Sequence, residues 1–460
     1  MNIFEWKRKY SQKQTSQYTH FDRRTSLDRC FTYITSRENI KKHGFYPFIH
    51  YTIKNRVVKH GKKTKPKERE IYYAAHIDGW IYRYYAHLIN EAYNQRVEID
   101  GINSVAVAYR TNLKQSNIDF AHKAFQYIRN TGPCHVIIGD FTDFFDNLDH
   151  AYLKQQLCDL LSVNRLPEDI FAVYKNITRF SYVELKDLLE LNELPDTKLG
   201  RKAFNAYSRE RALSTKKFRK NKNIIHASPH PKCGVPQGSP ISAVLANVYM
   251  LAADRKIHEY VSTFSGFYMR YSDDFIIILP KNSTDFSEHY KKIKSILDSI
   301  PNLILKESKT KIFLVDKSIV QNQTTTYLAN TCNTKNIIEF LGFSFDGQYI
   351  RVRDKTISRY YNKLYRKLQT IIKNNGVTPH PHNHRISCRN LYQQYSYKGS
   401  RYYLGRKTDK INSPLAKDAV KGNFLDYIYR SKKKFNGDPI DTSTKKHMQK
   451  IRKRLKYIYK

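Results

Sequence analysis

Three aspartates are the residues of this chain best suited to chemistry. Asp140 lies at the end of the apolar run Cys134–Phe141, which predicts a short buried strand. Asp273 and Asp274 lie between two further apolar runs, a pattern typical of a hairpin with acids at its turn. Carboxylates of this kind could hold two divalent ions about 3.5–4 Å apart, which stabilise the attacking and leaving oxygens of a displacement at phosphorus. Aspartate is also common in ordinary turns, so each motif taken alone leaves a solvated turn as the alternative.

A string rich in Pro and Gly stands between the two acidic motifs. It is Val235–Ser242, with the sequence VPQGSPIS. Its Pro and Gly residues predict a tight turn, and apolar positions at helical spacing over 242–261 predict a helix after it. Backbone amides at such a helix start can approach a nucleotide or a template strand closely. The string therefore favours a shared site over unrelated turns.

Other segments must position these motifs. Apolar residues at helical spacing predict a long helix from Ile71 to about Asn94, and a second helix is expected from Asp149 to Leu161. A short β element is expected at 339–350. The basic run Lys59–Lys67 predicts an exposed loop that could contact phosphates. The mixed helical and basic segment 165–230 is interpreted as an insertion.

The charge of the chain indicates the kind of partner. It has 81 Lys and Arg against 41 Asp and Glu, a net charge of +40. Self-repulsion of this size favours a nucleic acid partner over an acidic membrane surface. Residues 351–460 hold 29 Lys and Arg against 6 Asp and no Glu, which predicts a separate basic, mainly helical unit. Because no long apolar stretch and no apolar signal core are present, we expect a cytoplasmic protein without membrane contact.

In their order and approximate spacing the motifs resemble those of the reverse transcriptase family. Asp140–His150, with the sequence DFTDFFDNLDH, resembles the first catalytic motif of the family. VPQGSPIS resembles the second, and Tyr271–Asp274 fills the Tyr-x-Asp-Asp box. Two weaker elements, Leu303–Lys311 and Phe340–Phe343, follow in family order. The resemblance covers about residues 60–350.

The resemblance implies an α+β fold of the right-hand polymerase type. In it, residues 1–134 form an N-terminal extension and fingers. Residues 135–350 form the palm, an antiparallel sheet plus helices with a basic insertion around 165–230. Residues 351–460 form a basic helical thumb or C-terminal RNA-binding region.

It also implies a role for each matching residue. Asp140, Asp273 and Asp274 would bind two Mg²⁺ ions, for which Mn²⁺ can substitute, and Lys309 would give a proton to the leaving pyrophosphate. Phe145 would be a steric gate that rejects a ribose 2′-hydroxyl. The alternatives are a plain surface lysine for Lys309 and a core phenylalanine for Phe145. The other implied contacts are, with the nucleotide, Arg69, Phe141, Gln237 and Gly238, and, with primer or template, Tyr271, Phe340, Leu341 and Gly342.

Within the family, the chain resembles the bacterial stand-alone enzymes associated with phage defence, including the abortive-infection enzymes. The likeness rests on Ala75–Tyr82, on Ala108–Arg110 and on the long spacer between the first two palm motifs. It implies DNA synthesis from deoxynucleotides, with a companion non-coding RNA as template. Template-independent or protein-primed synthesis, an RNA-dependent RNA polymerase and a non-catalytic RNA-binding scaffold stay open. So do a homo-oligomer and an accessory protein.

A group of metal-ligating residue types occurs near the C-terminus. His380, His382 and His384 precede Cys388 in a Pro-rich stretch. Their spacing is not that of the usual zinc sites, so a structural or RNA-contacting loop is expected.

Overall fold

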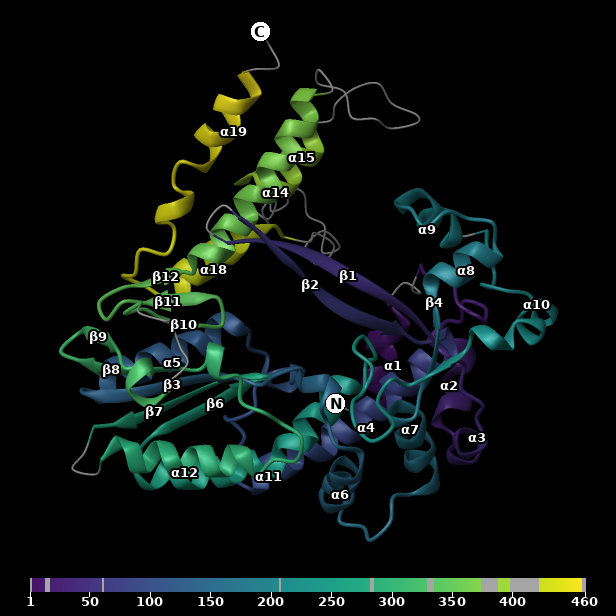
Figure 1. The fold of residues 1–460 in the computed structure, drawn as a ribbon, viewed down its shortest axis with the longest axis horizontal. Coiled ribbons are helices and arrows are strands. Elements are labelled where there is room, and N and C mark those ends of the chain that lie inside the picture. The colour runs from purple at the N-terminus through teal and green to yellow at the C-terminus, as the bar shows by residue number, and fades with distance from the viewer. Residues whose placement is uncertain are drawn as a thin grey trace.

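The computed structural model describes residues 2–12, 17–59, 62–206, 208–281, 285–328, 335–373, 388–397 and 422–456. This part of the chain combines helices with three sheets, which confirms the expected α+β class (Figure 1). Within it, no helix is both long enough and apolar enough to cross a membrane. The group of His380, His382 and His384 lies outside the described residues.

A long two-stranded ribbon dominates the N-terminal part. It pairs β1 (Phe48–Lys59) with β2 (Lys62–Tyr73) in antiparallel fashion. The prediction of an exposed loop at Lys59–Lys67 is therefore wrong, because most of these residues form backbone pairs that a basic composition does not reveal. The register shifts beside Pro66, which has no N–H to give to the ladder. Three short helices precede the ribbon: α1 (Ile3–Ser11), α2 (Leu27–Thr35) and α3 (Arg37–Lys41).

The long helix expected from Ile71 forms as α4 (His76–Ile99). It starts later than expected because Ile71–Tyr73 still pair with β1. Most of its predicted apolar stripe is buried, although Leu88 remains 38% exposed. The helix thus forms a large part of the main core.

Segment 165–230 contributes to the same sheet as the ribbon. Its strand β4 (Ser181–Glu184) pairs parallel with β1, and β5 (His226–Ala227) pairs with β4, so the order is β2-β1-β4-β5. The segment also carries four helices: α7 (Glu168–Thr178), α8 (Leu185–Leu191), α9 (Lys198–Phe204) and α10 (Thr215–Lys220). The division of the chain into three domains stays a prediction.

The central sheet is antiparallel, in the order β6-β7-β3-β8-β9. Its first three members confirm the predicted strand and hairpin. The strands are β3 (Cys134–Asp140), β6 (Phe267–Tyr271), β7 (Asp274–Pro280), β8 (Lys311–Asp316) and β9 (Ile319–Asn322).

Both faces of this sheet are covered, which explains why β3 and β7 each carry an unbroken run of buried apolar residues, Val136–Ile138 and Phe275–Leu279. Phe275 and Ile277 of β7 join the main core with α11 (Ser242–Thr263) and α12 (Phe286–Asp298). Ile276 and Ile278 face the other way, into a core with α5 (Asn117–Thr131). The predicted helices after the strand acid and the VPQGSPIS string are confirmed as α6 (His150–Leu161) and α11.

The expected β element at 339–350 is a small antiparallel sheet of β10 (Ile338–Phe340), β11 (Phe343–Phe345) and β12 (Ile350–Val352). Helices follow it: α14 (Asp354–Lys373), α15 (Cys388–Tyr395), α18 (Phe424–Lys434) and α19 (His447–Leu455). In α14, Leu364 and Leu368 are buried whereas Arg359, Lys363 and Arg366 are exposed, so this helix has an apolar face and a basic face. Whether these helices act as a thumb stays a prediction.

Candidate active site

Strand pairing brings the acids of two distant motifs to one edge of the central sheet. In the β3–β7 pair, Asp140 is directly opposite Asp274, and in the β6–β7 hairpin Tyr271 is opposite Asp274. Ser272 and Asp273 form the turn. Ser272 has a φ of 63°, a left-handed conformation that non-glycine residues rarely adopt. The three acids therefore lie together at this edge of the sheet, as expected for a shared site.

Asp140 is buried, and only one of its two carboxylate oxygens accepts a hydrogen bond. Its Oδ2 accepts a hydrogen bond from Lys309 Nζ at 2.5 Å, whereas its buried Oδ1 has no hydrogen-bond partner. Lys309 reaches it from a short 3-10 helix, Glu307–Lys309, which is held in place because the Lys306 amide donates to the Asp140 carbonyl. The predicted grouping of Lys309 with the acids is thus present.

The site has an excess of negative charge. Removal of water by the surrounding protein raises the pKa of Asp274, and the charges of Asp273 and Asp140 add to this rise, so that the pKa reaches about 7. Lys309 opposes this rise but does not cancel it. An acid whose pKa is held near 7 by its neighbours is relieved when a cation binds.

The donor set fits a hard divalent cation. Asp140, Asp273 and Asp274 offer only carboxylate oxygens, which Mg²⁺ prefers, and Asp140 Oδ1 is a buried acceptor without a donor. As these side chains stand, the described residues contain no group of three or more His, Cys, Asp or Glu that could hold a metal ion. The acids would have to close around an ion, and Lys309 would have to share Asp140 with it.

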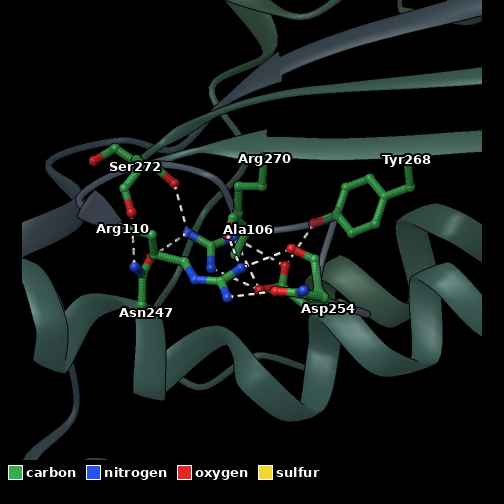
Figure 2. Close-up of polar contacts among 9 residues, drawn as sticks. Ala106, Arg110, Asn247, Asp254, Tyr268, Arg270 and Ser272 are labelled. Atoms are coloured by element: carbon green, nitrogen blue, oxygen red, sulfur yellow. Dashed lines mark hydrogen bonds and ion pairs between the residues drawn. The ribbon is translucent and has the colours of Figure 1, made fainter. Parts of the chain in front are cut away.

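A buried ion pair supports the β6–β7 turn (Figure 2). Arg270 and Asp254 are both fully buried, and Arg270 Nη2 lies 2.6 Å from Asp254 Oδ2. Asp254 also accepts a hydrogen bond from Tyr268 Oη at 2.8 Å. Arg270 Nη1 donates to the Ser272 carbonyl at 2.9 Å and lies 3.4 Å from Asn247 Oδ1. Helix α11 therefore holds the turn that carries Asp273.

Burial lowers the pKa of Arg270, but the Asp254 carboxylate outweighs this effect and raises the pKa above its ordinary value. The Asp254 carboxylate therefore favours the charged form of Arg270.

Segment 105–110 lies against the other side of the hairpin. The Arg270 amide donates to the Val105 carbonyl at 2.8 Å, and Asn247 Nδ2 donates to the Ala108 carbonyl at 3.0 Å. Tyr109 adopts a φ of 64° and its hydroxyl is 3.0 Å from Ser272 Oγ. The sequence showed Ala108–Arg110 only as a family likeness, and nothing in its pattern indicated this contact.

The VPQGSPIS turn is joined to the first motif and to the ribbon. Gln237 Nε2 donates to both Asp146 oxygens, at 3.2 and 3.3 Å, and the Tyr72 amide donates to the Gln237 carbonyl at 2.9 Å. Gly238 has a φ of 115°, and a Cβ there would lie 2.6 Å from the Tyr72 carbonyl oxygen. Only glycine allows this approach between turn and ribbon.

The two phenylalanines of the first motif lie differently. Phe141 is 2% exposed and packs between Phe144 and Phe275. Its side chain belongs to the core, so only its backbone is available to a nucleotide. Phe145 is half-buried beside Phe144, and its role as a gate stays a prediction.

Other predicted contacts are not brought to the acids. Arg69 is exposed on β2, opposite Ile53, and no hydrogen bond or ion pair of the described residues joins it to the aspartates. Phe340 is buried, and Leu341 and Gly342 form the β10–β11 turn, where Asn117 Nδ2 donates to the Leu341 carbonyl. Their nucleotide and primer roles stay predictions.

Comparison with known proteins bears on the matched part of this site. Residues 199–345 match the family model described as "Reverse transcriptase (RNA-dependent DNA polymerase)". This stretch is similar to the reverse transcriptase family. The match includes Gln237, Asp273, Asp274 and Lys309, whereas Asp140 precedes it and lies beside the matched stretch through the pairing of β3 with β7. No curated protein matches the chain.

Solved telomerase structures show a distant likeness. Apo telomerase from Candida tropicalis, truncated from its C-terminal domain, is 12% identical over 66% of this chain and 57% of that chain, with a TM-score of 0.39. Telomerase from Candida albicans with a fragment of telomeric RNA is 14% identical over 91% and 60%, with a TM-score of 0.38. This chain thus spans about three fifths of each.

Proposed function

We propose that this chain is an RNA-directed DNA polymerase that joins deoxynucleotides at the edge formed by Asp140, Asp273 and Asp274. The observation that carries the proposal is the pairing of Asp140 with Asp274, with Lys309 on Asp140, beside a stretch similar to the reverse transcriptase family. An ordinary solvated turn would not be expected to bring these acids together beside a buried carboxylate oxygen, Asp140 Oδ1, that has no hydrogen-bond donor.

The residues divide the work as follows. Divalent cations bound by the three aspartates would supply charge stabilisation for the attacking and leaving oxygens. Lys309 holds a proton at Nζ and would give it to the leaving pyrophosphate. Phe145 would exclude a ribose 2′-hydroxyl by contact. Gln237, held by Asp146, would lie along the nucleotide.

A charge-matched pair of variants tests the proposal. Purified protein is given an RNA template, a DNA primer, labelled deoxynucleotides and Mg²⁺. Asp273→Asn/Asp274→Asn should abolish primer extension, whereas Asp187→Asn/Glu190→Gln on α8 should extend at the wild-type rate. Extension that survives in the first variant would overturn the assignment of the site. RNA binding without extension by any protein would favour a scaffold.

We further propose that the template is a companion non-coding RNA and that the DNA product serves antiphage defence. The support is the net charge of +40 and the likeness of Ala75–Tyr82 and Ala108–Arg110 to defence-associated enzymes. RNA that copurifies with the protein should be sequenced together with any DNA made from it. DNA unrelated to the bound RNA would contradict this template and favour template-independent synthesis, and a phage challenge with the Asp273→Asn/Asp274→Asn variant tests the role in defence.

A further inference from the structure

A basic hollow lies outside the catalytic edge, lined by residues of α6, of α7 and of the chain at 231–232. Its volume is about 500 Å³, within the range of small-ligand pockets. Four cations line it, and none of them forms an ion pair with a carboxylate of the described residues. They are Lys154, Lys175, Arg179 and Lys232.

Aromatic side chains complete the hollow. Phe171 is 41% exposed although it is a large apolar side chain, and its ring stacks on Tyr174 with centroids 6.2 Å apart and planes 24° apart. Lys154 Nζ lies 5.3 Å from the centre of the Phe171 ring. A flat apolar surface beside unpaired cations matches the two parts of an unpaired nucleotide, a base that stacks and a phosphate that carries charge.

The one carboxylate in the hollow does not neutralise these cations. Asp149 Oδ1 caps α6 by accepting from the Tyr152 amide, and Oδ2 accepts from Asn302 Nδ2 at 3.2 Å. The hollow therefore keeps a positive charge, which favours a polyanion over a neutral metabolite.

The hollow is joined to the VPQGSPIS turn by one residue. His150 Nε2 lies 2.8 Å from the Gly234 carbonyl, its amide donates to the Lys232 carbonyl at 3.0 Å, and its own carbonyl accepts from Tyr174 Oη at 2.6 Å. A strand held in the hollow would thus be separated by His150 from Gly234, the start of the segment that leads to Gln237.

We propose that this hollow binds an unpaired stretch of nucleic acid, with a base against Phe171 and phosphates on Lys154, Lys175, Arg179 and Lys232. The site is separate from the catalytic edge, and the proposal holds whether or not the chain polymerises.

Two matched pairs of variants test it in the full-length chain. Lys154→Gln/Lys175→Gln removes two charges from the hollow, and Lys291→Gln/Lys292→Gln removes two from the exposed face of α12. The probe is a fluorescent 12-nucleotide oligouridine, titrated from 50 to 300 mM KCl with the catalytic cleft saturated by a blunt primer–template duplex. Each phosphate contact on a single strand contributes about 0.7 to the slope of log affinity against log salt. The slope for Lys154→Gln/Lys175→Gln should therefore be smaller by about 1.4, and this variant should bind roughly tenfold more weakly.

Phe171→Ala tests the stacking contact, with Phe4→Ala at another exposed phenylalanine as its control. Phe171→Ala should weaken binding about tenfold with an unchanged salt slope, because stacking releases no counterions. An oligothymidine of equal length distinguishes an RNA template strand from a DNA product strand as the occupant. Tighter binding of the oligouridine would assign the hollow to the template, and equal or tighter binding of the oligothymidine would assign it to the product. Equal losses in the α12 control, or no loss in either hollow variant, would overturn the proposal.

Discussion

The buried pair of Arg270 and Asp254 allows the support of the β6–β7 turn to be separated from fold stability. Asp254→Asn removes the negative charge but keeps the volume, and it leaves Arg270 charged in a place without water. Breaking a buried ion pair by removing one partner costs about 3–5 kcal/mol. We therefore expect a large drop in the free energy of unfolding, measured by urea denaturation.

A second variant restores the fold without restoring the support. Arg270→Met/Asp254→Leu/Tyr268→Phe leaves neither a buried charge nor an orphan hydroxyl, and such apolar replacements are often neutral or stabilising. The Ser272 carbonyl nevertheless loses its charged donor, a hydrogen bond worth about 1.5–3 kcal/mol. If that bond holds Asp273 in place, single-turnover nucleotide addition should fall about 10- to 100-fold while the melting temperature stays near that of the wild type.

Either of two results would refute this reasoning. Asp254→Asn protein with wild-type stability would show that Arg270 finds another partner or reaches water. A triple variant that adds nucleotides at the wild-type rate would show that the β6–β7 turn keeps its shape without Arg270.

Three further predictions concern the acids, the turn and the gate. Because burial and the neighbouring acids raise the pKa of Asp274 to about 7, its ionisation opposes folding increasingly as the pH rises from about 4 to 7. Metal-free Asp274→Asn protein should therefore unfold at a higher temperature than the wild type at pH 8, with no difference near pH 4; a constant difference would contradict this. Gly238→Ala places a Cβ against the Tyr72 carbonyl and should cost about 1–3 kcal/mol in urea denaturation, whereas Gly44→Ala, with open space around it, should cost far less. Phe145→Ala should raise ribonucleotide use relative to deoxynucleotide use more than tenfold in primer extension, and no gain would remove Phe145 as the gate.

The sequence could predict the acids because their pattern is local. Asp140 follows an apolar strand and Asp273 and Asp274 lie in a hairpin turn, so each motif marks its own element. At Lys59–Lys67 the same local information gave a wrong prediction. The charge indicated an exposed loop, whereas most of these residues pair between β1 and β2. The start of α4 was displaced for the same reason, since residues that fit either element joined the strand.

Contacts between distant residues could not be predicted in this way. Arg270 and Asp254 lie on a strand and a helix, and neither carries a local signal that it is buried and paired. Tyr109 reaches Ser272 only because segment 105–110 docks beside β6. The pairing of β4 with β1 likewise depends on the path of segment 165–230, which composition does not record.

The order of strands in the central sheet has a consequence for biosynthesis. Asp140 pairs with Asp274, 134 residues later in the chain. At about 5–20 residues per second, β3 leaves the ribosome roughly 7–27 s before its partner β7 leaves it. During that interval its apolar residues have no neighbouring strand, so nascent chains halted before β7 should need a chaperone, and those halted after β9 should not.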